Sequence, residues 1–191
     1  MRVKSRWNKK DRVRSAQETA SAMGFICCRI AQNALLNIEN ADFQVDTQLQ
    51  RLEVIKEFLA FLTHVVDRIA YDRMDDEERA EFIRALARRL ADYVQDNTRD
   101  FAGPGDYRTP FIDLLNRRME DYAEFSFIDG GPSFQLARYF SERVGETLGP
   151  RNRQWIGNQI IDAEVPEAME SLRKAVKNLL PERTPRQEAD A

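Results

Sequence analysis

The chain has 191 residues, of which 42% are hydrophobic and 32% charged, with 8 glycines and 7 prolines. This length and composition are typical of one soluble globular domain, and they exclude a collagen-like, low-complexity or largely disordered chain. The net charge of −3 is unevenly spread, because residues 1–14 carry seven basic side chains and one acid, a local charge of +6. The rest of the chain carries −9, unlike the basic body of most nucleic-acid-binding domains.

Residues 1–14 contain Trp7 among their cations, and we expect them to form a flexible arm. Such an arm can dock on an acidic protein surface, bind nucleic acid or anionic lipid, or stay in solvent. The acidic body favours docking on a partner or a second copy over nucleic acid or a membrane. Because the opening residues hold no apolar signal stretch and no run approaches 18 apolar residues, the sequence predicts a cytoplasmic protein without a transmembrane segment.

The first helix is expected to start behind Ser15, which forms a capping box with Glu18. Small residues then recur at every fourth position from Ala16 to Cys28, and Gly24 lies in the middle of this seam. Glycine inside a helix costs about 1 kcal/mol relative to alanine. We therefore expect Gly24 where another helix approaches closely.

The two cysteines of the chain, Cys27 and Cys28, are neighbours within this first helix. Helical geometry turns adjacent side chains about 100° apart, which disfavours a disulfide between them. The sequence therefore predicts two buried free thiols, in agreement with a reducing compartment.

A second helix is expected to begin at Asp46 or Thr47, with Thr47 and Gln50 as another capping pair, and to run to about Ile69. Its apolar residues cover more than one face. This pattern is typical of a helix that neighbours surround on several sides, so we expect it at the centre of the fold.

A third helix is expected from Asp75, with four consecutive acids in its first turn, where the helix dipole is positive. Its outward face holds Arg84, Arg88 and Arg89. A loop containing Gly-Pro-Gly follows, over Phe101–Arg108.

Three further helices are expected in the second half. The fourth starts with Thr109 as N-cap before Pro110 and ends at Asp129-Gly130-Gly131-Pro132. The fifth covers about Ser133–Leu148. The last runs from about Asn152 to Leu180, and Pro166 must kink or divide it near Asp162.

The predicted fold is thus all-α, a single-domain bundle of six to seven helices over residues 15–180. Residues 1–14 form the basic flexible arm. Residues 181–191 are polar, contain two prolines and are expected to be a disordered tail.

The single histidine, His64, excludes sites that need two: the H-E-x-x-H zinc site, the di-iron carboxylate bundle and histidine–aspartate phosphohydrolases. His64 lies on the flank of the apolar second helix, and we expect a structural, hydrogen-bonded residue. A catalytic base, a ligand contact and a pH sensor are the alternatives. No phosphate-binding glycine motif occurs in the chain.

One enzymatic alternative remains, in which carboxylates inside the bundle hold Mg²⁺ for hydrolysis or bind a small ligand. Two groups have the E-x-x-E spacing of such sites: Glu78 with Glu81, and Glu164 with Glu167 and Glu170. The E-x-x-D pair, Glu39 with Asp42, falls in a predicted loop. An acidic first turn explains Glu78 without a metal. We therefore predict no cofactor and no metal ligand.

Arg151, Arg153 and Trp155 follow Gly149-Pro150 and form a basic-aromatic group. Two arginines beside helical N–H groups could hold an anion, whereas Trp155 could equally anchor the core. Since no catalytic set is complete, the sequence favours a non-enzymatic protein-interaction or adaptor module, with a homodimer as its expected form. The candidate binding residues are Arg151, Arg153, Trp155, His64 and Trp7.

Overall fold

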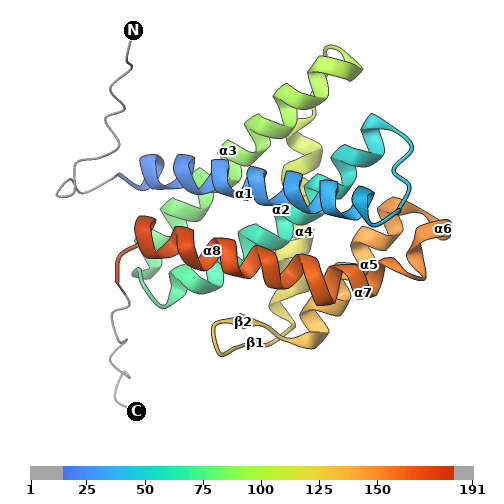
Figure 1. Ribbon diagram of the computed structural model, residues 1–191. Coiled ribbons are helices and arrows are strands. Elements are labelled where there is room, and N and C mark those ends of the chain that lie inside the picture. Colours follow the sequence, from blue (N-terminus) through green and yellow to red (C-terminus); the bar gives the residue numbers. More distant parts are fainter. Residues whose placement is uncertain (1–14, 183–191) are drawn as a thin grey trace, which may run out of the picture.

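The structure is a computed structural model that describes residues 15–182 (Figure 1). The predictions for the arm, including Trp7, and for the tail beyond Glu182 lie outside the described residues. The all-α class is confirmed. The longer helices are α1 (Ala16–Asn40), α2 (Gln48–Tyr71), α3 (Asp76–Ala102), α4 (Arg108–Ala123), α5 (Phe134–Leu148) and α8 (Val165–Leu179). The shorter elements are β1 (Phe127–Ile128), β2 (Gly131–Pro132), α6 (Pro150–Arg153), α7 (Ile156–Gln159) and a π-helical turn, η2 (Ile160–Glu164).

The predicted helix starts at Ser15, Thr47, Asp75 and Ser133 are confirmed. Each of these four side chains accepts a hydrogen bond from the backbone N–H three residues on, at 2.8–3.2 Å. At Ser15 the capping box is complete, because Glu18 in turn accepts from the Ser15 N–H. Gln50 instead accepts from the N–H of Asp46, one residue before the cap.

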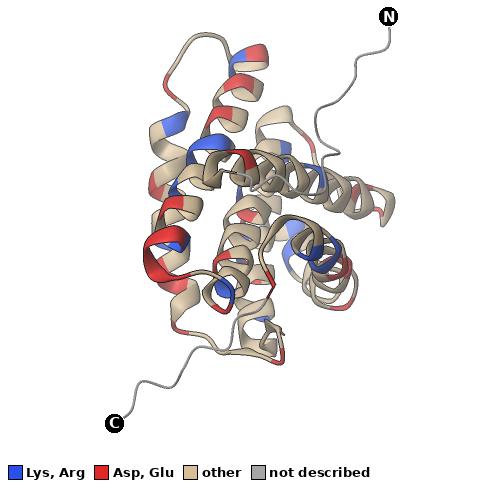
Figure 2. Cartoon of the chain, turned by 90° about the vertical axis from the view of Figure 1, so that its left-hand side faces the viewer, with Lys and Arg blue, Asp and Glu red and all other residues tan. Residues whose placement is uncertain are grey.

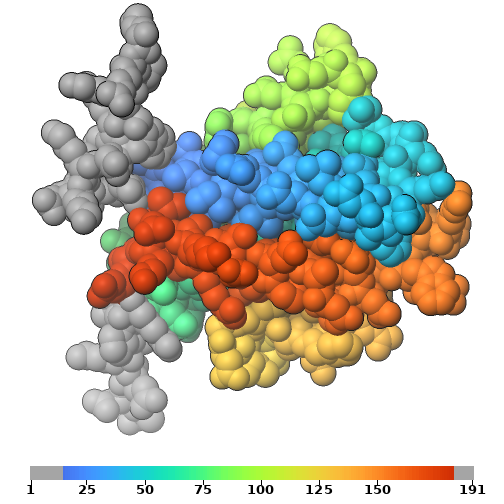
Figure 3. Space-filling view, in the orientation of Figure 1, coloured from blue at the N-terminus to red at the C-terminus, as the bar shows by residue number. Residues whose placement is uncertain are grey.

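Helix α2 is the central element, as its wide apolar surface predicted. Every residue from Glu57 to Val66 is buried, and α1, α3, α4 and α5 all pack against the helix. Phe61 stacks on Phe140 of α5 with ring centroids 4.2 Å apart. Helices α1 and α8 lie side by side across one face of the molecule, while the C-terminal end of α3 projects beyond the body (Figures 1 and 3).

Both predicted ends of the fourth helix are wrong. The side chain of Asp106, and not that of Thr109, caps the start of this helix. Its carboxylate accepts hydrogen bonds from the N–H groups of Arg108 and Thr109, and α4 begins at Arg108. The helix then stops at Ala123. The following Phe127–Pro132 forms a small antiparallel hairpin whose turn residues, Asp129 and Gly130, have φ of 53° and 71°.

The last helical stretch has an interruption that the sequence did not predict, at Gln154 and Trp155 between α6 and α7. Near Asp162, where Pro166 was expected to kink or divide the helix, the chain stays helical but forms the π-helical turn Ile160–Glu164. A π turn adds one residue to the helical register. As a result Glu164 is buried where the sequence pattern had placed Ala163 inside.

Basic and acidic positions both occur over most of the helical body (Figure 2). Among the described residues, no helix is long and apolar enough to span a membrane.

Candidate functional site

A groove between α1 and α3, with a volume of about 210 Å³, combines exposed apolar and basic side chains. Phe25 stands at its edge with 61% of its surface exposed. Arg29 and Arg89 are exposed beside it, one from each helix. The side chain of Gln32 donates a hydrogen bond to Tyr93 Oη at 2.9 Å, which links the two helices across the groove. The α1–α3 groove is lined by Gly24, Phe25, Cys28, Arg29 and Gln32 of α1 and by Arg89 and Tyr93 of α3.

Gly24 allows the basic wall of this groove to lie close to α1. A Cβ atom at position 24 would be 3.0 Å from Arg89 Cγ and 3.6 Å from Leu86 Cδ1. The close approach predicted for Gly24 is therefore confirmed, and the approaching group is the aliphatic stem of Arg89. Such a stem packs on apolar surface while its guanidinium stays in water.

The outer face of α1 extends the groove by a further exposed apolar residue. Phe25, Arg29, Gln32 and Leu36 are spaced at i, i+4, i+7 and i+11, so they lie on one face of the helix over roughly 16 Å. Leu36 is 54% exposed. We call the α1–α3 groove together with Leu36 the α1 docking face.

The arginines of this face lack acidic partners. Arg79, Arg108 and Arg118 form ion pairs with carboxylates, whereas Arg29 and Arg89 form none within residues 15–182. On α3, Arg84 and Arg88 are exposed as predicted, and they also lack ion pairs in this part of the chain. The charge of the α1 docking face is therefore not compensated by carboxylates of the described residues.

Cys28 lies at the base of the groove and is a packing residue. Both cysteines are buried and free, as predicted. Burial raises the pKa of the Cys28 thiol to about 12 and that of Cys27 further still, so both stay protonated at neutral pH. Neither thiol is therefore a nucleophile in this state.

His64 is buried in the core, 3% exposed, but the hydrogen bond expected of it is missing at Nε2. Its ring centroid lies 5.5 Å from that of Tyr122, whose hydroxyl is also buried without a hydrogen-bond partner among residues 15–182. Burial, with a smaller contribution from Arg68, lowers the pKa of His64 to about 4. A neutral, enclosed imidazole fits the structural role better than that of a catalytic base.

A buried ion pair lies near this aromatic group, between α2 and α4. Arg118 donates from Nε and Nη2 to the two carboxylate oxygens of Glu57, both at 2.8 Å. Its third nitrogen donates to Asp121 at 3.2 Å, and Tyr139 of α5 donates to the same carboxylate at 2.7 Å. Every charge in this cluster meets one of opposite sign, so we assign it to stability.

The predicted group of Arg151, Arg153 and Trp155 does not converge on one site. Arg151 contacts Gln44 in the loop between α1 and α2, and Arg153 lies 3.6 Å from Glu146 of α5. Trp155 is 65% exposed and so does not anchor the core. The three residues are close in the sequence, but their side chains point to different partners, which the sequence could not show.

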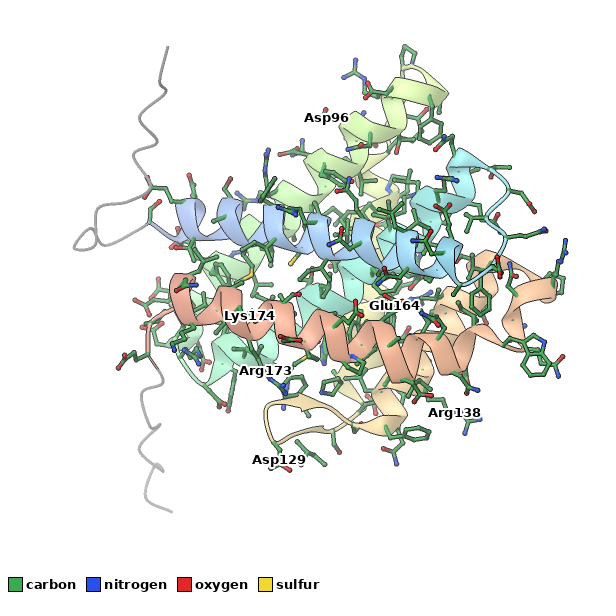
Figure 4. All side chains as sticks on the ribbon, in the orientation of Figure 1. Asp96, Asp129, Arg138, Glu164, Arg173 and Lys174 are labelled. Atoms are coloured by element: carbon green, nitrogen blue, oxygen red, sulfur yellow. The ribbon has the colours of Figure 1, made fainter. Side chains whose placement is uncertain are left out.

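Glu164, one of the glutamates with E-x-x-E spacing, is buried in the structure, which the sequence did not predict. It accepts hydrogen bonds from Gln159 at 2.8 Å and from Asn37 of α1 at 3.2 Å, where the chain before α8 passes next to α1 (Figure 4). Asn37 also donates to Glu167. The one available signal was Pro166, which predicts a disturbed helix but not which side chain the disturbance buries.

The carboxylates of the magnesium alternative do not gather into one site. Glu164 and Glu167 both accept a hydrogen bond from Asn37, whereas Glu170 is exposed and accepts from Lys174. Glu78 and Glu81 are both exposed on α3. Over the described range, no group of three or more His, Cys, Asp or Glu side chains is arranged to hold a metal ion. In three comparisons with known proteins, no family model, no curated protein and no solved structure matches this chain.

Proposed function

We propose that this chain is a non-enzymatic, cytoplasmic protein-interaction module that binds its partner through the α1 docking face. The observation that supports the proposal is the convergence of an exposed phenylalanine and two arginines without acidic partners on one groove. Interface centres are enriched in aromatic residues and arginine relative to the rest of a protein surface. A homodimer, as the sequence predicted, is one form of this proposal.

The test is site-specific photocrosslinking of the full chain in its own cells. A photoreactive amino acid replaces Phe25, and in a matched control it replaces Phe134, which is equally exposed at 63% but lies at the start of α5. We expect adducts of discrete mass from position 25, absent from position 134 and lost when R29E and R89E are added.

No adduct from position 25, or the same adducts from both positions, would overturn the proposal. Adducts at twice the mass of the chain would identify a second copy as the partner. Cell fractionation in the same experiment tests the cytoplasmic location.

A further inference from the structure

We propose that the partner of the α1 docking face is an acidic amphipathic helix of another protein. This inference rests on the proposed function and specifies the chemistry of the occupant. It follows from three properties of the face: its size, its direction along α1 and its uncompensated positive charge.

The size of the groove suits a side chain better than a metabolite. Small-molecule sites have volumes of about 300–1,000 Å³, whereas the α1–α3 groove has about 210 Å³. A single large apolar side chain fits a space of this kind. The exposed ring of Phe25 at the edge would cover that side chain on one flank.

The exposed side chains of the α1 docking face follow the axis of α1, and such a row suits a helix as the binding partner. Phe25 and Leu36 are separated by three turns of α1 and point the same way, with Arg29 and Gln32 between them. A partner helix lying along α1 meets these positions with its own residues at i, i+3, i+4 and i+7, the usual arrangement when a helix docks in a groove. One apolar residue would enter the groove, and another would cover Leu36.

The charge of the face selects the polar residues of the partner. Arg29 and Arg89 stand on opposite helices with no carboxylate of residues 15–182 paired to either. Asp or Glu side chains flanking the apolar anchor can form charge-assisted, bidentate contacts with such guanidinium groups. The body as a whole carries −9, but charges beyond about 8–10 Å are largely screened at physiological salt.

Two occupants from this chain itself fit less well. Residues 1–14 carry +6 and would be repelled by the two arginines. A second copy that docked through the same face by two-fold symmetry would bring four of these arginines together, with no acid in the groove to compensate them. Charge complementarity therefore favours a different, acidic protein.

The experiment is selection of binders to the full chain from a displayed library of 18-residue helical peptides with randomised surface positions. We expect the selected peptides to share an apolar stripe flanked by Asp and Glu, in excess of the starting library. R29E/R89E and, separately, F25D should each weaken their binding at least tenfold. Replacing the acids of a selected peptide by lysine should restore its binding to R29E/R89E.

The matched control is R173E/K177E, which changes the net charge equally at two exposed positions of α8 and should alter binding less than twofold. Circular dichroism verifies that every variant is folded. A library that yields no binders, binders without excess acid, or binders indifferent to R29E/R89E would overturn the inference. The proposed function would survive that result if Phe25 still crosslinks to a protein, and both fail if it does not.

Discussion

The bidentate contact between Glu57 and Arg118 places two nearly buried charges in one pair, and its loss should be costly. Arg118→Ala leaves the Glu57 carboxylate, 4% exposed, without its cation. Removing one partner of a buried ion pair typically costs about 3–5 kcal/mol, because the other charge stays buried and uncompensated. We expect a loss of this size in the free energy of unfolding, measured by urea denaturation.

The neighbouring Arg117→Ala is the matched control, since Arg117 is exposed on the same helix and should change stability by less than about 0.5 kcal/mol. The double variant E57L/R118M removes both charges together and should recover most of the loss. A loss equal in the double variant and in Arg118→Ala would show that the side-chain packing, and not the charge, is responsible.

His64 should make the protein less stable as the pH falls. The unfolded chain takes up a proton on this imidazole near pH 6.5, whereas burial holds the pKa of the folded state at about 4. Between these values the unfolded state binds more protons, so stability falls with decreasing pH, by roughly 3 kcal/mol in total at 1.36 kcal/mol per pH unit. His64→Phe, which cannot titrate, should lack this component, so the difference between the two proteins in urea denaturation should change from pH 7 to pH 4. A constant difference would contradict the buried, neutral state of His64.

At the level of helix pairs, Gly24 is where α1 accommodates the stem of Arg89. Gly24→Ala gains about 1 kcal/mol of helix propensity, but its new methyl group would lie 3.0 Å from Arg89 Cγ. We expect the full gain only when Arg89→Ala is also present, and a smaller gain or a loss in the native background. A double-mutant cycle by urea denaturation measures this coupling. Gains of equal size in both backgrounds would show that Arg89 does not contact Gly24 in solution.

The π turn of Ile160–Glu164 buries the carboxyl group of Glu164. This burial makes stability depend on pH in the opposite direction to the burial of His64. Desolvation raises the pKa of Glu164, while hydrogen bonds from Gln159 and Asn37 oppose the rise. The folded state therefore keeps this proton at a pH where the unfolded state has lost it, so stability decreases as the pH rises above about 4.5. The uncharged variant Glu164→Gln should gain stability relative to the native chain over that range. Urea denaturation of both proteins at a series of pH values measures this difference, and a difference that does not change with pH would contradict the burial of this carboxyl group.

The elements that the sequence predicted well are those whose signals are local. Caps such as Ser15 and Asp75 satisfy N–H groups three residues away, and the apolar residues of α2 define its central position without reference to any other segment. The sequence also holds a local signal near the end of α4, since Asp129-Gly130 is a typical hairpin turn, but the helix was expected to run up to it. The register of η2 has no such signal, because Pro166 predicts a disturbed helix without fixing which side chain is buried. The sequence predicted the α1 docking face only in part. Gly24 indicated a close approach of another helix, but only the fold shows that Arg89 lies beside Arg29.

At the scale of the whole molecule, two groups of cations have different consequences. The α1 docking face presents two arginines from two packed helices beside apolar groups, which suits the specific protein partner that we propose. Residues 1–14 carry seven cations and one acid, a net charge of +6, whereas the rest of the chain has a net charge of −9. Attraction of such a segment to a polyanion is almost entirely counterion release, which is independent of sequence and falls steeply with salt.

This separation predicts how the full chain responds to duplex DNA. In fluorescence anisotropy at 50 mM salt we expect weak binding through the arm, decreasing by about 10³-fold or more towards 200 mM because some six or seven phosphate contacts are screened. A variant with the seven basic residues of the arm replaced by glutamine should not bind, and R29E/R89E should bind like the native chain. Binding that persists at 150 mM salt, or that the arm variant retains, would place a nucleic-acid surface on the helical body. In that case the uncompensated arginines of the α1 docking face would be the first residues to test as phosphate contacts.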